Sequence, residues 1–217
     1  MKDLIIKAAR EAGILLMDNF ERGIRVEFKG KYDLVTEADH QSEALISGLI
    51  REGFPEHDIL AEEEDYGQFN SEYRWIIDPL DGTTNFAHGF PWFAVSIALE
   101  VRGRLTLGVV YNPYVGELYF AERGQGSFLN ERRLQVSETR ILERVLLATG
   151  FAYDNKSCKA NNYDYFARFQ KEAQACRRPG VASLDLASVA AGRFDGFWEM
   201  KLKPWDLAAG ILLVEES

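Results

Sequence analysis

The chain has 217 residues, of which 47% are hydrophobic and 27% are charged, as in an ordinary soluble globular protein. Its formal net charge of −9 argues against a nucleic-acid-binding surface, which needs a basic face. The sequence has no apolar run near the roughly 20 residues of a membrane span, no signal-peptide pattern and no disulfide or zinc spacing of its two cysteines, so we expect a cytoplasmic protein without a membrane partner.

Helical periodicity predicts two helices at the start of the chain. Apolar residues recur at helical spacing over residues 3–20, which predicts an amphipathic first helix. A second helix is predicted to follow Asp39 and to end near Gly53. By its position alone, Asp39 would be the N-cap of this second helix and would accept a backbone N–H bond.

An acidic run, Glu62–Asp65, follows the short apolar segment Ile59–Ala61. Consecutive acids on a surface turn are usually only solvated. The functional interpretation is that Glu62 and Glu63 follow a strand and join the aspartates of the next segment.

The segment Trp75–Phe86 has the strongest functional pattern in the chain. Its apolar start predicts a buried strand that ends at Asp78, since Pro79 cannot donate to a sheet. Asp81 follows in the adjoining turn, so two carboxylates can converge on one Mg²⁺, which prefers oxygen ligands. A plain strand and capped turn would give a similar pattern, because these residues are common turn formers.

The residues after Asp81 predict an anion site. Gly82 has no Cβ, so its backbone can approach a ligand closely. If a helix begins there, the N–H groups of Gly82 and Thr83 point outward as a cradle for an anion. Adjacent metal and phosphate sites are the arrangement required for metal-assisted phosphoryl chemistry.

The rest of the chain has mixed patterns. Alternating apolar residues over 93–129 predict an antiparallel meander. Further predicted elements are a strand over 144–149, a helix over 161–175, a turn over 177–180, a helix over 183–192, a strand over 195–199 and a final helix opened by Lys203–Asp206.

Four segments, in this order, resemble the inositol monophosphatase family of Mg²⁺-dependent, lithium-sensitive sugar phosphatases. They are Asp33–Asp39, Glu62–Glu63, Trp75 to Ile97, and Trp205–Gly210. The resemblance runs from the first helix to the last residue. It implies an α/β (α+β) layered sandwich, the sugar-phosphatase fold, with an N-terminal metal-site half over 1–149 and a C-terminal α/β half over 150–217, packed as one unit.

The resemblance also implies a role for individual residues. The metal ligands, for two or three Mg²⁺ ions, would be Glu62, Asp78, the Leu80 carbonyl, Asp81 and Asp206. The catalytic residues would be Thr83 and Asp39, which orient the attacking water, and Glu62, which helps to deprotonate it. The substrate-binding residues would be Asp81, Gly82, Thr83, Ala182, Glu199 and Asp206. Lys29 is similar to a loop lysine near a further metal position, and Glu63 is the second acid of the Glu62–Glu63 motif.

The implied function is Mg²⁺-dependent hydrolysis of a small phosphorylated polyol or sugar, and the preferred substrate would be an inositol monophosphate. The resemblance also implies a homodimer. Fructose 1,6-bisphosphatase activity, alone or as a second activity, is the alternative. A non-catalytic, phosphatase-like interaction protein is an alternative of another class.

The chain departs from the family pattern at three places. Ala61 stands where glycine is usual, and Val181 stands where a small polar residue is common. The chain ends at Ser217, where the family continues for several dozen residues, which indicates either a short member or a truncated sequence.

Overall fold

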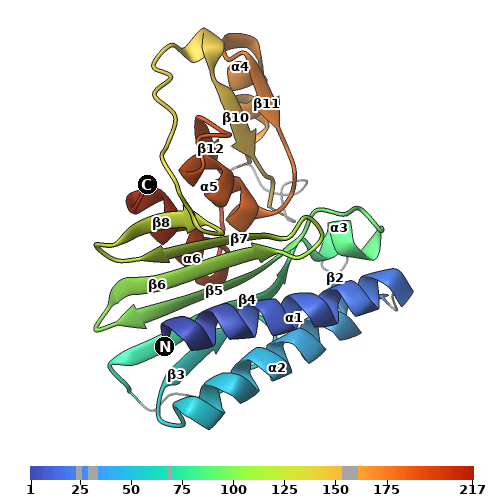
Figure 1. Ribbon diagram of the computed structural model, residues 1–217. Helices are drawn as coiled ribbons and strands as arrows, with labels where there is room; N and C mark the ends of the chain where they lie inside the picture. Colours follow the sequence, from blue (N-terminus) through green and yellow to red (C-terminus); the bar gives the residue numbers. More distant parts are fainter. Residues whose placement is uncertain (23–25, 29–33, 68–69, 153–160) are drawn as a thin grey trace.

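A seven-stranded sheet forms the centre of the molecule in the computed structural model, which describes residues 1–22, 26–28, 34–67, 70–152 and 161–217 (Figure 1). The order of its strands in space follows the sequence. They are β3 (Asp58–Ala61), β4 (Tyr73–Asp81), β5 (Ala94–Val101), β6 (Arg104–Asn112), β7 (Glu117–Glu122), β8 (Gly126–Leu129) and β9 (Arg132–Arg133). Only β3 and β4 pair in parallel, so the predicted antiparallel meander is confirmed.

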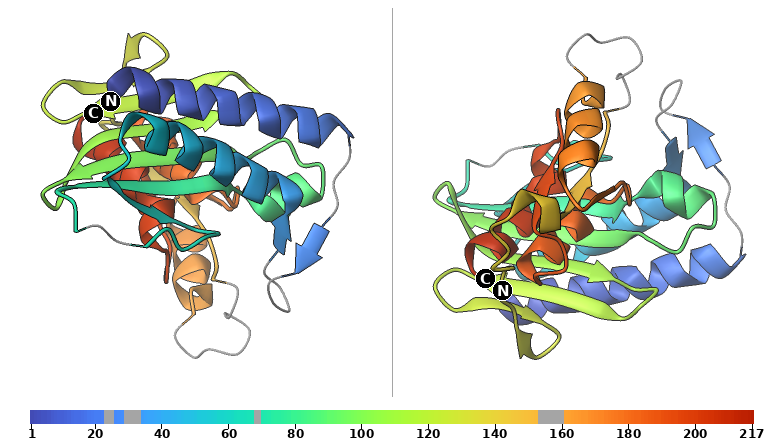
Figure 2. Two further views of the ribbon diagram at one scale, coloured as in Figure 1. Left: turned by 90° about the horizontal axis from the view of Figure 1, so that it is seen from below. Right: turned by 90° about the horizontal axis from the view of Figure 1, so that it is seen from above.

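Helices cover both faces of this sheet. On one face lie α1 (Lys2–Arg22) and α2 (Glu37–Gly53), which run side by side in the view from below (Figure 2). On the other face lie α5 (Ala182–Ala190) and α6 (Pro204–Glu215) (Figure 1). The molecule is therefore layered, helices on sheet on helices, as the fold prediction expected.

A second, parallel sheet of three short strands stands beyond α5 (Figure 1). Its order is β11 (Ala175–Arg177), β10 (Leu146–Thr149) and β12 (Gly196–Trp198), with α4 (Tyr163–Glu172) beside β11 and the 3₁₀ turn η1 (Leu142–Arg144) before β10. The expected division of the chain at residue 149 stays a prediction. Strand β10 lies before this position and pairs with β11 and β12, which lie after it. The remaining elements are the hairpin of β1 (Val26–Phe28) with β2 (Leu34–Thr36) and the short α3 (Thr83–Ala87).

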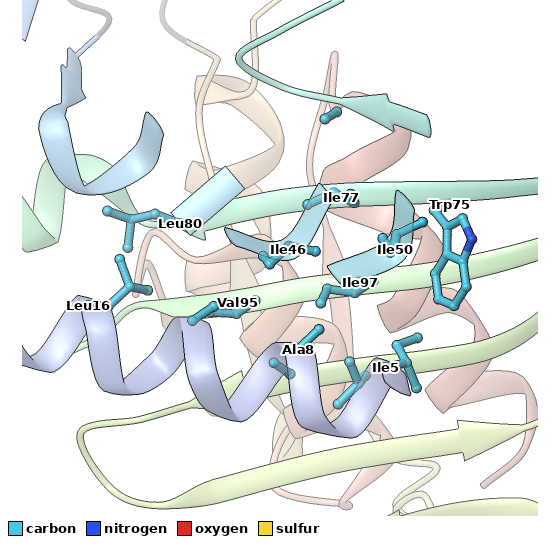
Figure 3. Close-up of a cluster of buried hydrophobic side chains, with 14 of the residues drawn as sticks. Ile5, Ala8, Leu16, Ile46, Ile50, Trp75, Ile77, Leu80, Val95 and Ile97 are labelled. Carbon is cyan, nitrogen blue, oxygen red and sulfur yellow. The ribbon is translucent and has the colours of Figure 1, made fainter. Parts of the chain in front are cut away.

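Alternate residues of the central strands supply the cores on the two faces. In β4, Trp75 and Ile77 pack under α1 and α2, against Ile5 and Ile46 among others (Figure 3). Ile76, between them, packs under α5 and α6. Because both faces are covered, the run Trp75–Ile77 is continuously apolar rather than alternating with polar residues.

Strand β4 is longer than the sequence predicted. The expectation that it ends at Asp78 is wrong, because it continues through Pro79 to Asp81. Asp78 pairs with Ser96 and Asp81 with Ala94, so three steps on β4 match two on β5. This extra residue is a β-bulge, where a proline is tolerated. The bulge interrupts the alternation of side chains and brings both aspartates to the same cavity.

Two boundaries in the second half also differ from prediction. The helix expected over 161–175 ends at Glu172, and the chain then enters β11, which extends to Arg177 at the start of the predicted turn. None of the helices that the structure describes combines the length and apolar character that a membrane crossing needs.

Candidate functional site

A cavity of about 380 Å³ opens where the end of β4, the start of α3, the start of α5 and the segment before α6 meet. Most of the predicted site residues line it, namely Glu62, Asp78, Leu80, Asp81, Gly82, Thr83, Ala182, Glu199 and Asp206. Lys29 lies outside the described residues. Segments far apart in the sequence therefore meet at one place.

Asp78 and Asp81 both line this cavity. Burial, followed by the charges of Glu62 and Asp81, raises the pKa of Asp78 well above its ordinary value. Burial and the charge of Asp206 raise the pKa of Asp81 to about 7. The Ser183 backbone N–H donates to Asp81 Oδ2 at 2.7 Å. The carboxylates repel one another, which is the electrostatic situation that a bound cation relieves.

Thr83 and Asp39 form the predicted pair. The Thr83 hydroxyl lies 3.1 Å from Asp39 Oδ1 and 3.1 Å from the Leu80 carbonyl oxygen, so its single proton can be donated to either. Thr36 fixes the other oxygen of Asp39, through its N–H at 2.8 Å and its hydroxyl at 2.6 Å. Burial raises the pKa of the Asp39 carboxyl, and the bonds from Thr36 oppose this shift.

Asp39 and Asp206 occupy equivalent places in two helices. The prediction that Asp39 is an N-cap is wrong, because α2 begins at Glu37 with Thr36 as its N-cap. Asp39 is the third helical residue and accepts the Thr36 N–H. Asp206 is likewise third in α6, and its Oδ2 accepts the Lys203 N–H at 2.6 Å. Each carboxylate thus combines helix capping with a position at the site.

The acidic turn after β3 directs its two glutamates differently. Glu62 lines both the cavity and a groove beside β3, whereas Glu63 lines only that groove and lies close enough to Asp39 to raise the pKa of that carboxyl. Ala61, the residue before them, is not among the described non-glycine residues with positive φ, so the substitution of glycine by alanine is accommodated.

Gly82 forms the turn between β4 and α3. Its φ is +98°, and a Cβ there would lie 2.8 Å from Val181 Cγ2 and 3.2 Å from the Trp92 carbonyl oxygen. Only glycine fits both the left-handed backbone and the close contact. Val181 packs onto this glycine and is not among the cavity-lining residues, so its side chain supports the turn.

Ala182 and Glu199 also line the cavity. Burial raises the pKa of Glu199 to about 7, with Asp81 adding to the shift and Arg178 opposing it. A Cβ on Gly150 would clash with the Glu199 carboxylate, so Gly150 makes room for this carboxylate.

Sequence reasoning missed several buried polar residues around the site. Asp185 is 1% exposed, and burial, then the charges of Asp81 and Glu199, raise its pKa to about 9. Glu43 and Ser42 of α2 are fully buried behind the site. A single acid or serine within a helical pattern resembles a surface residue, so the only available signal was their i, i+3 and i+4 spacing from Asp39.

The residues fit Mg²⁺ in kind: the four predicted carboxylate ligands (Glu62, Asp78, Asp81 and Asp206) line one cavity with Leu80, and oxygen is the ligand atom that Mg²⁺ requires. As placed, no three of the described His, Cys, Asp or Glu side chains converge closely enough to enclose an ion. The ligand set therefore gathers around the cavity wall without closing on one point.

Comparison with known proteins adds to this geometry. The model of the inositol monophosphatase family matches residues 1–217. An inositol-1-monophosphatase of Synechocystis sp. is 46% identical, covering 99% of this chain and 76% of that protein. The Nus factor SuhB of Pseudomonas aeruginosa is 47% identical, covering 100% of this chain and 83% of that protein. The crystal structure of the extragenic suppressor protein suhB from Bartonella henselae superposes with a TM-score of 0.92 at 43% identity, covering 99% and 84% of the two chains.

Proposed function

Because this chain belongs to the inositol monophosphatase family, we propose that it is a Mg²⁺-dependent phosphatase whose substrate is an inositol monophosphate. The observation that carries the proposal is the Thr83–Asp39 hydrogen bond at the edge of a cavity lined by Glu62, Asp78, Asp81 and Asp206. A phosphatase needs an oriented water beside groups that hold cations, and the hydroxyl and carboxylates of this cavity are the residue types suited to those two tasks.

The carboxylates would hold two or three Mg²⁺ ions. Their ligands would be Glu62, Asp78, the Leu80 carbonyl, Asp81 and Asp206. When bound, Mg²⁺ neutralises the charge of the phosphate and lowers the pKa of a coordinated water.

Thr83 and Asp39 would orient the attacking water. When the Thr83 hydroxyl donates to Asp39 Oδ1, its lone pairs remain to accept a hydrogen bond from water. Thr36 holds Asp39 in place, so the carboxylate oxygen that would accept the Thr83 proton has a fixed position. Glu62, across the cavity, would take the proton that the water loses.

The remaining residues would bind the substrate. The backbone N–H groups of Gly82 and Thr83 would hold phosphate oxygens, because they stand at the start of α3. Asp81, Ala182, Glu199 and Asp206 would bind the hydroxyls of the polyol.

Phosphate release by the purified chain tests the proposal, with and without Mg²⁺, on inositol 1-phosphate and fructose 1,6-bisphosphate in parallel. We expect Mg²⁺-dependent release from inositol 1-phosphate, abolished in Asp81→Asn while the variant stays folded. No release by a folded, monodisperse sample would refute the enzymatic proposal.

Fructose 1,6-bisphosphate is the second candidate substrate, for a structural reason. Three cations, Arg178, Lys201 and Lys203, line the same cavity as the carboxylates, whereas Arg177 does not. A second phosphate would find partners among them. Faster release from the bisphosphate would reverse the order of the two substrates.

A relative named Nus factor keeps the interaction-protein alternative open. If the protein is a binding module, the Thr83→Ala variant should still bind its partner. If it is an enzyme, the same variant should lose turnover.

Homodimer formation and lithium sensitivity are also proposed here, with light scattering and LiCl inhibition as their tests. Cytoplasmic location and the lack of a nucleic-acid partner stay predictions.

A further inference from the structure

One face of α2 contacts the segments that contain the proposed ligands. Asp39, Ser42 and Glu43 are at most 1% exposed and share this face, since residues i, i+3 and i+4 of a helix are neighbours. Asp39 accepts the Thr83 hydroxyl at 3.1 Å, and Ser42 Oγ donates to the Pro79 carbonyl oxygen at 2.9 Å. The bulge of β4 and the start of α3 are therefore both attached to α2.

Glu43 attaches the third segment. Its Oε2 accepts the backbone N–H of Glu63 at 2.9 Å, and its Oε1 accepts the backbone N–H of Glu64 at 2.9 Å. Bonds from N–H groups to a carboxylate are stronger than bonds between neutral groups. Both oxygens of a fully buried carboxylate are thus committed to the turn that directly follows Glu62.

We propose that Glu43 is a positioning residue for the metal site, which acts by fixing the turn that directs Glu62 into the cavity. The inference rests on the proposed function in one respect, that Glu62 is a metal ligand. The two bonds attach the residues directly after Glu62 to α2, and a displacement of about 1 Å is enough to impair a preorganised site. Outer partners of this kind change metal affinity by about 10- to 100-fold.

Glu43→Gln is the sharpest test. The variant has nearly the same shape, but its amide NH₂ replaces one acceptor and faces an N–H donor of Glu63 or Glu64. Glu43→Asp keeps two acceptors with a shorter reach and provides a second test if the Gln variant does not fold. Ile46→Val is the matched control, because Ile46 also lies on α2, is 0% exposed and packs in the hydrophobic core, where its side chain can form no hydrogen bond to the turn.

Three measurements decide the matter: Mn²⁺ affinity by electron paramagnetic resonance, amide exchange at residues 63 and 64 by NMR, and Tm. We expect Glu43→Gln to bind Mn²⁺ about tenfold or more weakly, with faster exchange of those two amides. Its KM for Mg²⁺ should rise while kcat at saturating Mg²⁺ changes little. Ile46→Val should change Tm without changing Mn²⁺ affinity, which separates positioning from general stability.

Wild-type Mn²⁺ affinity in folded Glu43→Gln would overturn the inference, and so would unchanged exchange at both amides. A wild-type chain that binds Mn²⁺ but releases no phosphate would refute the proposed function alone. A wild-type chain that binds no Mn²⁺ would refute both.

Discussion

Thr83 is the residue on which the proposed chemistry depends most directly. Replacing it with Val keeps the branched shape and removes the hydroxyl that lies 3.1 Å from Asp39 Oδ1. We expect kcat to fall by about 10²–10⁴, the usual effect of losing a group that directs proton transfer, while the CD spectrum and the KM for Mg²⁺ stay close to wild type. Steady-state kinetics at saturating Mg²⁺ measure this.

Thr84→Val is the control for that experiment. Thr84 lies in the same turn of α3 and lines the same cavity, so it tests the loss of a hydroxyl without the loss of the bond to Asp39. Equal losses of kcat in the two variants would contradict the assigned role of Thr83.

The crowded carboxylates make the stability of the metal-free chain depend on pH. The pKa of Asp81 is about 7 in the folded chain, against an ordinary value of 3.8, because of burial and the charge of Asp206. Between these two values the folded chain binds more protons than the unfolded chain, so the free energy of unfolding falls as pH rises through that window. Asp185, with a pKa of about 9, extends the fall to higher pH.

We therefore expect the Tm of the metal-free chain to decrease between pH 5 and pH 8, and Mg²⁺ to restore most of the loss at pH 8, since the ion binds only the folded site. Asp81→Asn should flatten this pH dependence and raise the metal-free Tm at pH 8 by a few degrees. Scanning calorimetry of both proteins at three pH values tests it. If Tm changed equally with pH in the two proteins, ionisation of Asp81 would not destabilise the metal-free fold.

At the scale of the elements, the turn of Gly82 is the most constrained connection at the site. Gly82→Ala places a Cβ at φ +98°, 2.8 Å from Val181 Cγ2. We expect it to destabilise the fold by about 2–4 kcal/mol, the sum of the left-handed backbone and the steric clash, and to abolish activity. Chemical denaturation gives the magnitude.

Gly89→Ala isolates the backbone part of that cost. Gly89 also has positive φ, +68°, but a Cβ there would meet nothing within 4 Å. Gly89→Ala should lower the free energy of unfolding by about 1–2 kcal/mol and leave activity intact. A loss as large as that of Gly82→Ala would mean that the crowding at Val181 contributes nothing.

Local pattern predicted most elements, and the misses have physical causes. The hairpin strands β5 to β7 were found because alternation and turn residues are local signals. The continuation of β4 past Pro79 could not be read locally, since the bulge depends on pairing with β5. β11 was missed because three residues carry no periodicity, and its partner β10 lies far away in the chain.

For the whole molecule, the motif residues indicated the site, but the arrangement of the site required the fold. Glu62, Asp78, Asp81 and Asp206 were found from the spacing within family motifs, and they do line one cavity. Glu43 belongs to none of the quoted segments, so only the packing of α2 against the turn after β3 reveals it.

The distance in sequence between the two walls of the cavity has a consequence for biosynthesis. The Ser183 N–H that holds Asp81 is made 102 residues after it, and α6, which carries Asp206, follows later still. A chain leaving the ribosome therefore contains the strands of the meander before it contains α5 and α6. These two helices cover the sheet face on which Ile76, Ala98 and Val110 lie. During that interval the nascent chain exposes an apolar sheet face, and we expect this stage of synthesis to be the one most prone to aggregation.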